Sequence, residues 1–488
     1  MSCPANAKQT CSHGAKVWHD LVCPTNCGKL NALYFCPSSR RPTWKSRDFL
    51  QSSSPTYAAF IILAFFCIWL SNTRVYKVVQ PAICLTMSQT PSLANTNLFK
   101  PIKVGQVELK NRLVYAPTTR YRATDEFVPT DSMLKYYEQR AENNGGLLIA
   151  EATFPDYSFG LYEKAPMIKT PQQVASWKKI IEAVHNKGSY FGIQLWHLGR
   201  AADPKLNKAL GVPLVAPSAL HIDETAENAA KEAGVELKAL TIAEIENVVK
   251  EFAAAAKRAI HEAKADFIEI HGAHGYLLDQ FNHVNINKRT DKYGGSIENR
   301  ARITLEVVDA CIEAVGAEHV AIRLSPYAKF QGAKGVDSEI HPIAHWGYIL
   351  SELERRGKEG KRLAYVSVVE PRVSGSEDSR DTRKFDVSWI GEVWKGVLLR
   401  SGAYLNENYK YISADVDKDD RTLIGVSRYY TSNPDLVERL QKGIPLTPYD
   451  RSKFYKRGSN DGYLTWAKHG EDPEKLKDLA DVPLKPLA

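Results

Sequence analysis

Three polar side chains follow a short apolar run in the segment Phe267-Ile-Glu-Ile-His-Gly-Ala-His-Gly-Tyr276. They are His271, His274 and Tyr276. Two imidazoles and a phenol at the end of a strand can bind one oxygen atom and protonate a nearby carbon, which is the chemistry that an activated double bond requires. A lone histidine there is more often structural. Two histidines followed by a tyrosine favour a functional site, because the alternation of side chains along a strand would not by itself bring three polar groups together.

The pair His271-x-x-His274 could instead hold a metal ion. The other predicted strand ends offer no set of carboxylates and histidines that would complete such a site. We therefore predict no metal centre.

Short apolar runs alternate with helical patterns from about residue 98, which predicts an α/β fold. The runs are Leu113–Ala116, Leu147–Ala152, Tyr190–Gln194, Phe267–His271, Val320–Leu324, Leu363–Val368, Val397–Leu399 and Thr422–Ile424. The helical patterns lie near 131–142, 171–187, 241–264, 297–315, 341–357, 404–410 and 434–442. Eight strands alternating with helices indicate a (β/α)8 TIM barrel. A doubly wound sheet is the alternative, which the absence of Gly-x-Gly-x-x-Gly weakens.

Two local patterns refine this prediction. Thr241-Ile-Ala-Glu244 is typical of a capping box, so a helix is expected to begin there, with Ile242, Ile245, Val248, Val249, Phe252, Ala256 and Ile260 on its apolar face. The stretch 200–238 is long and rich in Ala, Pro and Asp. In a barrel, such an insertion after a strand is expected at the active face, where it would shape the pocket.

In a barrel, functional residues lie at the carboxyl ends of the strands. Loops after strands seven and eight commonly bind phosphate, and Gly402, Ser427 and Arg428 stand there. Gln194 offers a donor and an acceptor to a pyrimidine-like edge, and Arg323 would be an unpaired buried charge without an anionic partner. These positions suit flavin mononucleotide (FMN). Trp196 is either core or a wall beside the flavin, and Tyr455 is a candidate lining residue.

The first 86 residues differ in composition from the rest. They carry nine Lys or Arg and two Asp or Glu, so seven of the eight net positive charges lie there, and seven of the eight cysteines do too. The remainder is nearly neutral, which gives no electrostatic case for nucleic acid. Its one cysteine, Cys311, gives no disulfide framework and suits a reducing compartment.

We divide the chain into an N-terminal extension, 1–86, and a barrel, 87–488. The apolar run 57–70 in the extension is shorter than the roughly 20 residues of a bilayer span. Three interpretations of the extension stay open: a wrongly assigned translation start, with Met87 as the true start; a membrane anchor; and a disordered or targeting tail. We expect a cytoplasmic protein, with membrane attachment through 57–70 as the alternative.

Residues from about 97 to 457 resemble the Old Yellow Enzyme family of FMN-dependent ene-reductases, in its fungal branch. The matching segments are Asn97–Gly105, Ala116–Arg120, Gln194–Trp196, His271–Tyr276, Arg289–Arg300, Arg323–Pro326, Val369–Arg372, Arg421–Gly425 and Ser432–Leu436. They cover about three quarters of the chain in the right order. The resemblance implies an FMN-bound barrel that reduces α,β-unsaturated carbonyl compounds with NADPH or NADH, and it leaves a role in fungal secondary metabolism open.

The resemblance also implies roles for individual residues. Pro117, Thr118, Thr119, Ala152, Gln194 and Arg323 would hold the flavin ring, and Gly402, Ser427 and Arg428 its phosphate. His271 and His274 would bind the substrate carbonyl oxygen beside Trp196 and Tyr455. Hydride would pass from flavin N5 to Cβ, and Tyr276 would protonate Cα.

The chain departs from the family pattern at three positions. His274 stands where the family often has Asn, which keeps a donor. Ser427 stands where Gly is common, so its Cβ restricts close approach to a phosphate. Ala403 follows Gly402 where yeast members often have Asn.

Two other functions stay open. One is a redox-neutral isomerase or tailoring flavoenzyme of a biosynthetic pathway, against which Tyr276 argues. The other is a non-catalytic flavin-binding or membrane scaffold, against which the complete His271, His274 and Tyr276 set argues. The expected partner is a small enone or enal, and the protein is expected to be a monomer or homodimer.

Overall fold

The computed structural model describes residues 90–375, 377–379 and 385–488. Thr86–Ala488 forms a compact unit of its own. The predicted extension 1–86 and its apolar run 57–70 lie outside the described residues. In the part of the chain that is described, no helix has the length and apolar character needed to cross a membrane.

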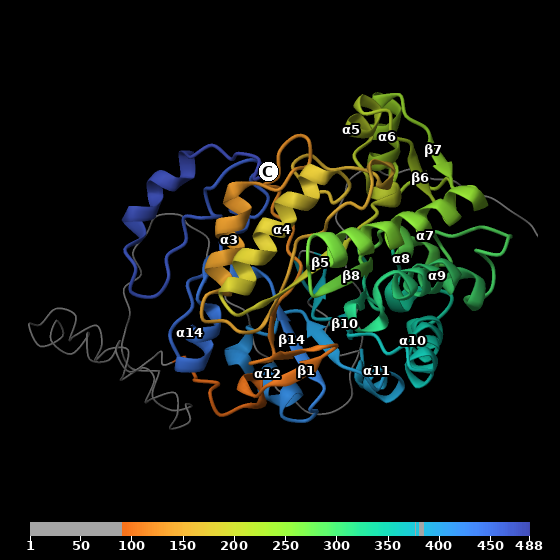
Figure 1. Cartoon of the computed structure of the whole chain (residues 1–488). Helices are drawn as coiled ribbons and strands as arrows, with labels where there is room; N and C mark the ends of the chain where they lie inside the picture. Colours follow the sequence, from red (N-terminus) through yellow and green to blue (C-terminus); the bar gives the residue numbers. More distant parts are fainter. Residues whose placement is uncertain (1–89, 376, 380–384) are drawn as a thin grey trace, which may run out of the picture. The chain divides into compact units, whose positions relative to one another are not determined.

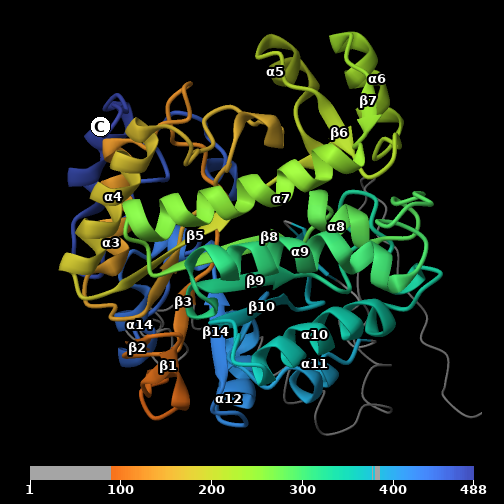
Figure 2. The ribbon, with the colours of Figure 1, turned by 45° about the vertical axis from the view of Figure 1, so that its right-hand side comes forward.

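Eight parallel strands close into a barrel, which confirms the predicted fold (Figures 1 and 2). The strands are β3 (Leu113–Tyr115), β4 (Leu147–Ile149), β5 (Tyr190–Leu195), β8 (Phe267–Gly272), β9 (Val320–Leu324), β10 (Tyr365–Val369), β13 (Leu398–Ser401) and β14 (Thr422–Val426). Pairing of β14 with β3 closes the ring. Each strand overlaps one predicted apolar run. The runs are apolar without alternation because each strand is buried on both faces and needs apolar side chains on both faces.

Helices surround the barrel and connect its strands. They are α3 (Asp131–Ala141), α4 (Pro171–Asn186), α5 (Pro204–Ala209), α6 (Glu224–Ala233), α7 (Ile242–Lys257), α8 (Leu277–Asn282), α9 (Ile297–Val315), α10 (Pro342–Lys358), α11 (Ser388–Val393), α12 (Lys410–Val416), α13 (Arg428–Ser432) and α14 (Leu436–Lys442). Figure 2 shows α7 and α9 side by side on the outside of the barrel.

Short 3-10 and π turns complete the described backbone. The 3-10 turns are η1 (Asn97–Phe99), η2 (Tyr157–Phe159), η3 (Gly199–Ala201), η5 (Ala317–His319), η6 (Gly335–Asp337), η7 (Glu407–Tyr409), η8 (Arg451–Lys453) and η9 (Pro473–Asp481), and η4 (Arg258–Glu262) is a π turn that extends α7. The helix predicted at 404–410 is misplaced, because α12 begins only at Lys410. Glu407, Asn408 and Tyr409 have positive φ values of 49°, 57° and 64°, which a continuous right-handed helix does not allow.

The capping box predicted for α7 is present. The Thr241 hydroxyl accepts from the Glu244 backbone N–H at 3.2 Å, and the Thr241 N–H donates to Glu244 Oε2 at 2.7 Å. Most of the predicted apolar face is buried, including Phe252. Ile242 is an exception at 39% exposure. It stands in the first turn of the helix.

One end of the barrel is closed by apolar side chains. The hairpin of β1 (Ile102–Val104) and β2 (Val107–Leu109) packs with residues from the amino-terminal parts of the barrel strands, among them Phe267 and Tyr365. The hairpin turn needs Gly105, whose φ is +52° and whose added Cβ would lie 2.2 Å from the Glu318 carbonyl oxygen. The opposite, carboxyl end is therefore the end available for a site.

The predicted insertion 200–238 is folded rather than an irregular loop. It contains α5, α6 and a parallel pair of short strands, β6 (Leu214–Ala216) and β7 (Leu237–Ala239). These elements lie together at the upper right of Figure 1. Its residues do not line the two cavities described below, but Arg200 donates to the Gln331 carbonyl oxygen at 3.0 Å, next to Phe330, which lines the larger cavity.

Candidate active site

Two adjoining cavities open at the carboxyl end of the barrel strands. The larger encloses about 900 Å³ of empty space and the smaller about 620 Å³, open solvent at their mouths included. They share five lining residues: His274, Arg323, Gly375, Ser427 and Arg428. A single ligand could therefore extend from one cavity into the other.

The predicted site residues all line these cavities. The larger cavity has Pro117, Thr118, Thr119, Ala152, Gln194, Trp196, His271, His274, Tyr276, Arg323, Ser427, Arg428 and Tyr455. Gly402 lines the smaller one. Residues more than 300 positions apart in sequence thus meet at one place, because the strands of a barrel end on a common rim.

The two histidines of the larger cavity are held as neutral imidazoles. Burial lowers the pKa of His274 to about 3 and also lowers the pKa of His271 well below its usual range, with the positive charge of Arg323 adding to both. Their ring centroids are 5.9 Å apart. A neutral imidazole keeps one N–H, so each can donate to an oxygen atom placed between them.

The backbone of the loop fixes where His274 lies. Its φ is +58°, and its backbone N–H donates to the Ser325 hydroxyl at 2.8 Å. Its Nε2 atom is buried without a protein hydrogen-bond partner. A buried polar atom of this kind normally has a partner, so Nε2 is available for a ligand in the cavity.

Tyr276 lies beside the histidines as a protonated phenol. Its ring centroid is 5.0 Å from that of His271. Burial raises the pKa of Tyr276 well above its usual range, and the neighbouring Tyr162 and Tyr121 add to the rise. The hydroxyl therefore keeps its proton at neutral pH and can donate it.

The turn before Tyr276 is specified by Gly275 and Asp279. Gly275 has a φ of +70°, and an added Cβ would lie 2.8 Å from the Gln331 Cβ. Its N–H donates to Asp279 Oδ2 at 2.8 Å, in the first turn of α8. Sequence analysis missed Asp279, although a carboxylate in the first turn of a helix is a recognised signal for such a contact.

Two buried carboxylates hold other lining residues of the larger cavity in place. Glu151 Oε2 accepts from the backbone N–H groups of Arg120 at 3.0 Å and Tyr121 at 3.2 Å, which fixes the loop that carries Thr118 and Thr119. Glu269 Oε1 accepts from Gln194 Nε2 at 2.7 Å. Neither carboxylate was predicted as a site residue, because strand sequence alone does not show which neighbouring strand a side chain meets.

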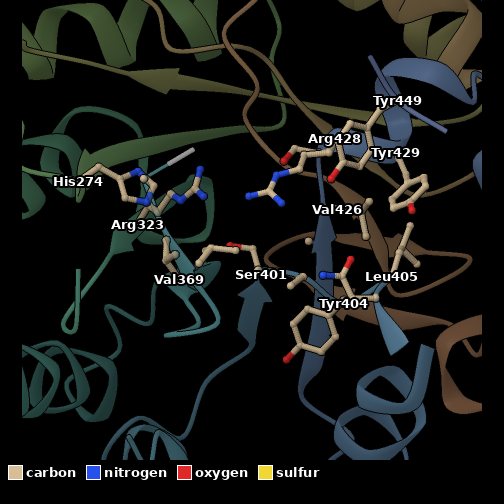
Figure 3. Close-up of a pocket in the computed structure, with 17 residues that line it drawn as sticks. His274, Arg323, Val369, Ser401, Tyr404, Leu405, Val426, Arg428, Tyr429 and Tyr449 are labelled. Atoms are coloured by element: carbon tan, nitrogen blue, oxygen red, sulfur yellow. The ribbon is translucent and has the colours of Figure 1, made fainter. Parts of the chain in front are cut away.

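The smaller cavity presents positive charge. In Figure 3 the guanidinium groups of Arg323 and Arg428 point towards the same space. Gly402, with φ of +128°, lets the backbone pass close to Val373, whose Cγ2 would lie 3.1 Å from an added Cβ. Arg400, by contrast, pairs with Glu370 at 2.7 Å outside this space. A phosphate suits a cavity with this positive charge.

The larger cavity suits a flat, polar ring. Arg323 lines it, and its Nε atom is buried without a protein hydrogen-bond partner, as is His274 Nε2. Gln194 adds an amide at one end, and Trp196 and Phe330 add aromatic walls. Phe330 was not predicted, although it lies in the loop after β9, where a barrel site is expected.

The fold and the site together define a flavin oxidoreductase. The sequence matches the NADH:flavin oxidoreductase / NADH oxidase family over residues 97–447, and the chain belongs to that family. This confirms the predicted family and the prediction of an oxidoreductase that uses a flavin and a nicotinamide nucleotide.

Two relatives and one solved structure are similar to this chain over most of its length. The chain is 50% identical over 384 residues to a probable NADPH dehydrogenase of Candida albicans, covering 78% of this chain and 92% of the relative. It is 43% identical over 389 residues to enoate reductase 1 of Kluyveromyces lactis, covering 78% and 96%. The crystal structure of Old Yellow Enzyme from Pichia sp. AKU4542 is similar, with 62% identity, a TM-score of 0.78, and coverage of 81% of this chain and all of that one.

Proposed function

We propose that this chain binds FMN and uses NADPH or NADH to reduce the carbon–carbon double bond of α,β-unsaturated carbonyl compounds. The observation that carries the proposal is the meeting of His271, His274 and Tyr276, all uncharged, at a cavity that also holds Gln194 and Arg323. The relatives named as NADPH dehydrogenase and enoate reductase support it.

FMN, when bound, would accept hydride from the nicotinamide and supply it to the substrate. Its ring would lie in the larger cavity against Pro117, Thr118, Thr119, Ala152, Gln194 and Arg323. Its phosphate would lie in the smaller cavity against Gly402, Ser427 and Arg428. The guanidinium group of Arg428, directed into the smaller cavity, favours a mononucleotide tail with a terminal phosphate.

The histidines would bind and orient the substrate. His271 and His274 would each donate an N–H to the carbonyl oxygen of the enone. As negative charge develops on that oxygen during reduction, these fixed donors stabilise it, and they do so strongly because the site is buried. Neutral donors need no proton uptake for this role.

Tyr276 would complete the reaction by donating its hydroxyl proton to Cα. Burial keeps the phenol protonated, and contact with Trp196 orients it. A positioned proton donor favours saturation of the double bond over a redox-neutral isomerisation. Trp196 and Tyr455 would line the substrate side of the cavity and exclude water.

The test uses the purified protein. It should be yellow, bleach with NADPH under anaerobic conditions, and regain its colour on addition of cyclohex-2-enone. A colourless protein that FMN cannot reconstitute would overturn the proposal, as would a reduced flavin that enones do not reoxidise.

A further inference from the structure

A carboxylate lies inside the barrel, beneath the site. Glu269 has no solvent exposure and stands between Phe267 and His271 on β8. Alternate residues of a strand share a face, so all three side chains point into the barrel. Phe267 belongs to the apolar cluster at the closed end, and His271 lines the larger cavity. Glu269 therefore lies in the layer of side chains directly beneath the site.

Burial of this carboxylate is costly. Burial raises the pKa of Glu269 above its usual range, and the charge of Arg323 with hydrogen bonds from Gln194 and Tyr365 offsets only part of that rise. Barrel interiors are usually filled with branched apolar residues, and a buried carboxylate persists only where neighbours compensate its charge. Two of the neighbours that do so here, Gln194 and Arg323, line the larger cavity.

The contact with Gln194 orients that residue's amide. Gln194 and Glu269 lie opposite each other in the pairing of β5 with β8, and Gln194 Nε2 donates to Glu269 Oε1 at 2.7 Å. In this contact the NH₂ group of Gln194 faces the carboxylate and the carboxylate oxygen accepts. The carbonyl oxygen of Gln194 is thereby directed away from Glu269 and towards the cavity.

Glu269 acts on Arg323 through its negative charge. Burial lowers the pKa of Arg323, and the negative charge of Glu269 raises it again. Arg323 stands one strand away, paired with His271 in the β8–β9 register. The positive charge that Arg323 presents to the cavity is therefore partly offset from below by Glu269.

We infer that Glu269 is a positioning residue that sets the reduction potential of the bound flavin, through the orientation of Gln194 and the charge it places under Arg323. This inference rests on the proposed function. A reduced flavin ring carries more negative charge than an oxidised one, so a stronger positive field favours reduction. Removal of the Glu269 charge should therefore raise the potential.

The test measures the midpoint potential of the FMN-loaded protein. Glu269→Gln removes the charge and keeps the shape, and the equilibrium constant for flavin reduction should rise at least about tenfold, or about 30 mV for a two-electron couple. Glu269→Met removes the charge with a different side chain and should shift the potential in the same direction. It also keeps the test decisive if the glutamine variant does not fold.

Two controls separate charge from packing. Tyr365→Phe removes a buried hydroxyl beside Glu269 and keeps the carboxylate itself, so the potential should shift less than in Glu269→Gln. Glu269→Asp keeps the carboxylate and shortens the side chain, so its potential should lie closer to that of the wild type than the potential of Glu269→Gln does. A yellow Glu269→Gln protein with an unchanged potential would overturn the inference, whereas a colourless wild-type protein would overturn the proposed function instead.

Discussion

The phenol ring of Tyr276 stands edge-on against the indole of Trp196, with ring centroids 4.8 Å apart and planes at 88°. Trp196 in turn stacks on Phe154, at 5.2 Å and 4°. The two contacts leave the phenol little freedom to turn. A proton donor that is fixed in this way delivers its proton to one face of a substrate.

Replacement of Tyr276 by Phe should separate the two halves of the reaction. Flavin reduction by NADPH should keep its rate, because it needs no proton from this residue. Reoxidation by cyclohex-2-enone should slow by about 100-fold or more, the usual contribution of a positioned acid. Stopped-flow absorbance of the flavin measures each half separately. An equal fall in both rates would contradict the assignment of Tyr276 as proton donor.

Replacement of His271 by Ala should weaken stabilisation of the substrate oxygen. Loss of one donor to a developing charge typically costs about 100-fold or more in rate, and the loss should fall on the enone half-reaction. His274→Asn is the matched comparison, because the amide keeps an N–H donor, and its effect should be much smaller. Similar losses in the two variants would argue that shape, rather than hydrogen bonding, is what matters at these positions.

The histidines should contribute no pH dependence near neutrality. The pKa of His274 lies near 3 and that of His271 well below its usual range, so both stay neutral as pH rises from 5.5 to 8. The pH profile of enone reduction in His274→Asn should therefore have the same shape as that of the wild type. A break near pH 6.5 that the variant removes would show that a histidine titrates in the active range.

Glu151 should make folding stability fall as the pH rises. Burial raises the pKa of Glu151 to about 7, above its unfolded value of 4.5. The folded state then binds the proton more tightly, so this stability is fully present below pH 4.5 and is lost as pH rises through about 7. Between low and high pH, this linkage lowers the free energy of unfolding by about 3 kcal/mol.

Glu151→Gln tests this linkage, because glutamine cannot ionise and its oxygen can still accept from Arg120 and Tyr121. Its free energy of unfolding, measured with urea at pH 5 and pH 8, should fall less with pH than that of the wild type. Glu232→Gln, on the exposed surface of α6, is the control and should follow the wild type. Parallel pH dependence in all three proteins would exclude Glu151 as the titrating group.

Arg428→Ala should weaken binding of FMN but not of riboflavin. A charged hydrogen bond to phosphate contributes about 1.5–3 kcal/mol, which is about 10- to 100-fold in affinity. Riboflavin lacks the phosphate, so its affinity should not change. Arg457→Ala is the control, because Arg457 lies over the Tyr121 ring, 5.0 Å from its centroid, away from the smaller cavity. Titration of the wild-type and the two variant apoproteins with each flavin measures the six affinities.

The strands and the rim residues could be predicted because they depend on local sequence. Runs such as Val320–Leu324 are apolar throughout, and the residues that end them must reach the rim of any barrel. Glu151 and Glu269 could not be predicted as supports, since their partners are set by the register between strands. The helix expected at 404–410 failed for a different reason: three successive residues have positive φ values, which interrupt a right-handed helix and which an apolar pattern does not signal.

The loop from His271 to Tyr276 contains every side chain proposed to handle the substrate's oxygen and proton, whereas the residues proposed to hold the cofactor are spread from residue 117 to residue 428. The reactive residues and the cofactor-binding residues can therefore change independently of one another during evolution. A single short exchange of sequence can replace the reactive groups, while loss of the cofactor requires changes on many separate strands. Divergent descendants of such a chain would be expected to change their reaction while they stay yellow.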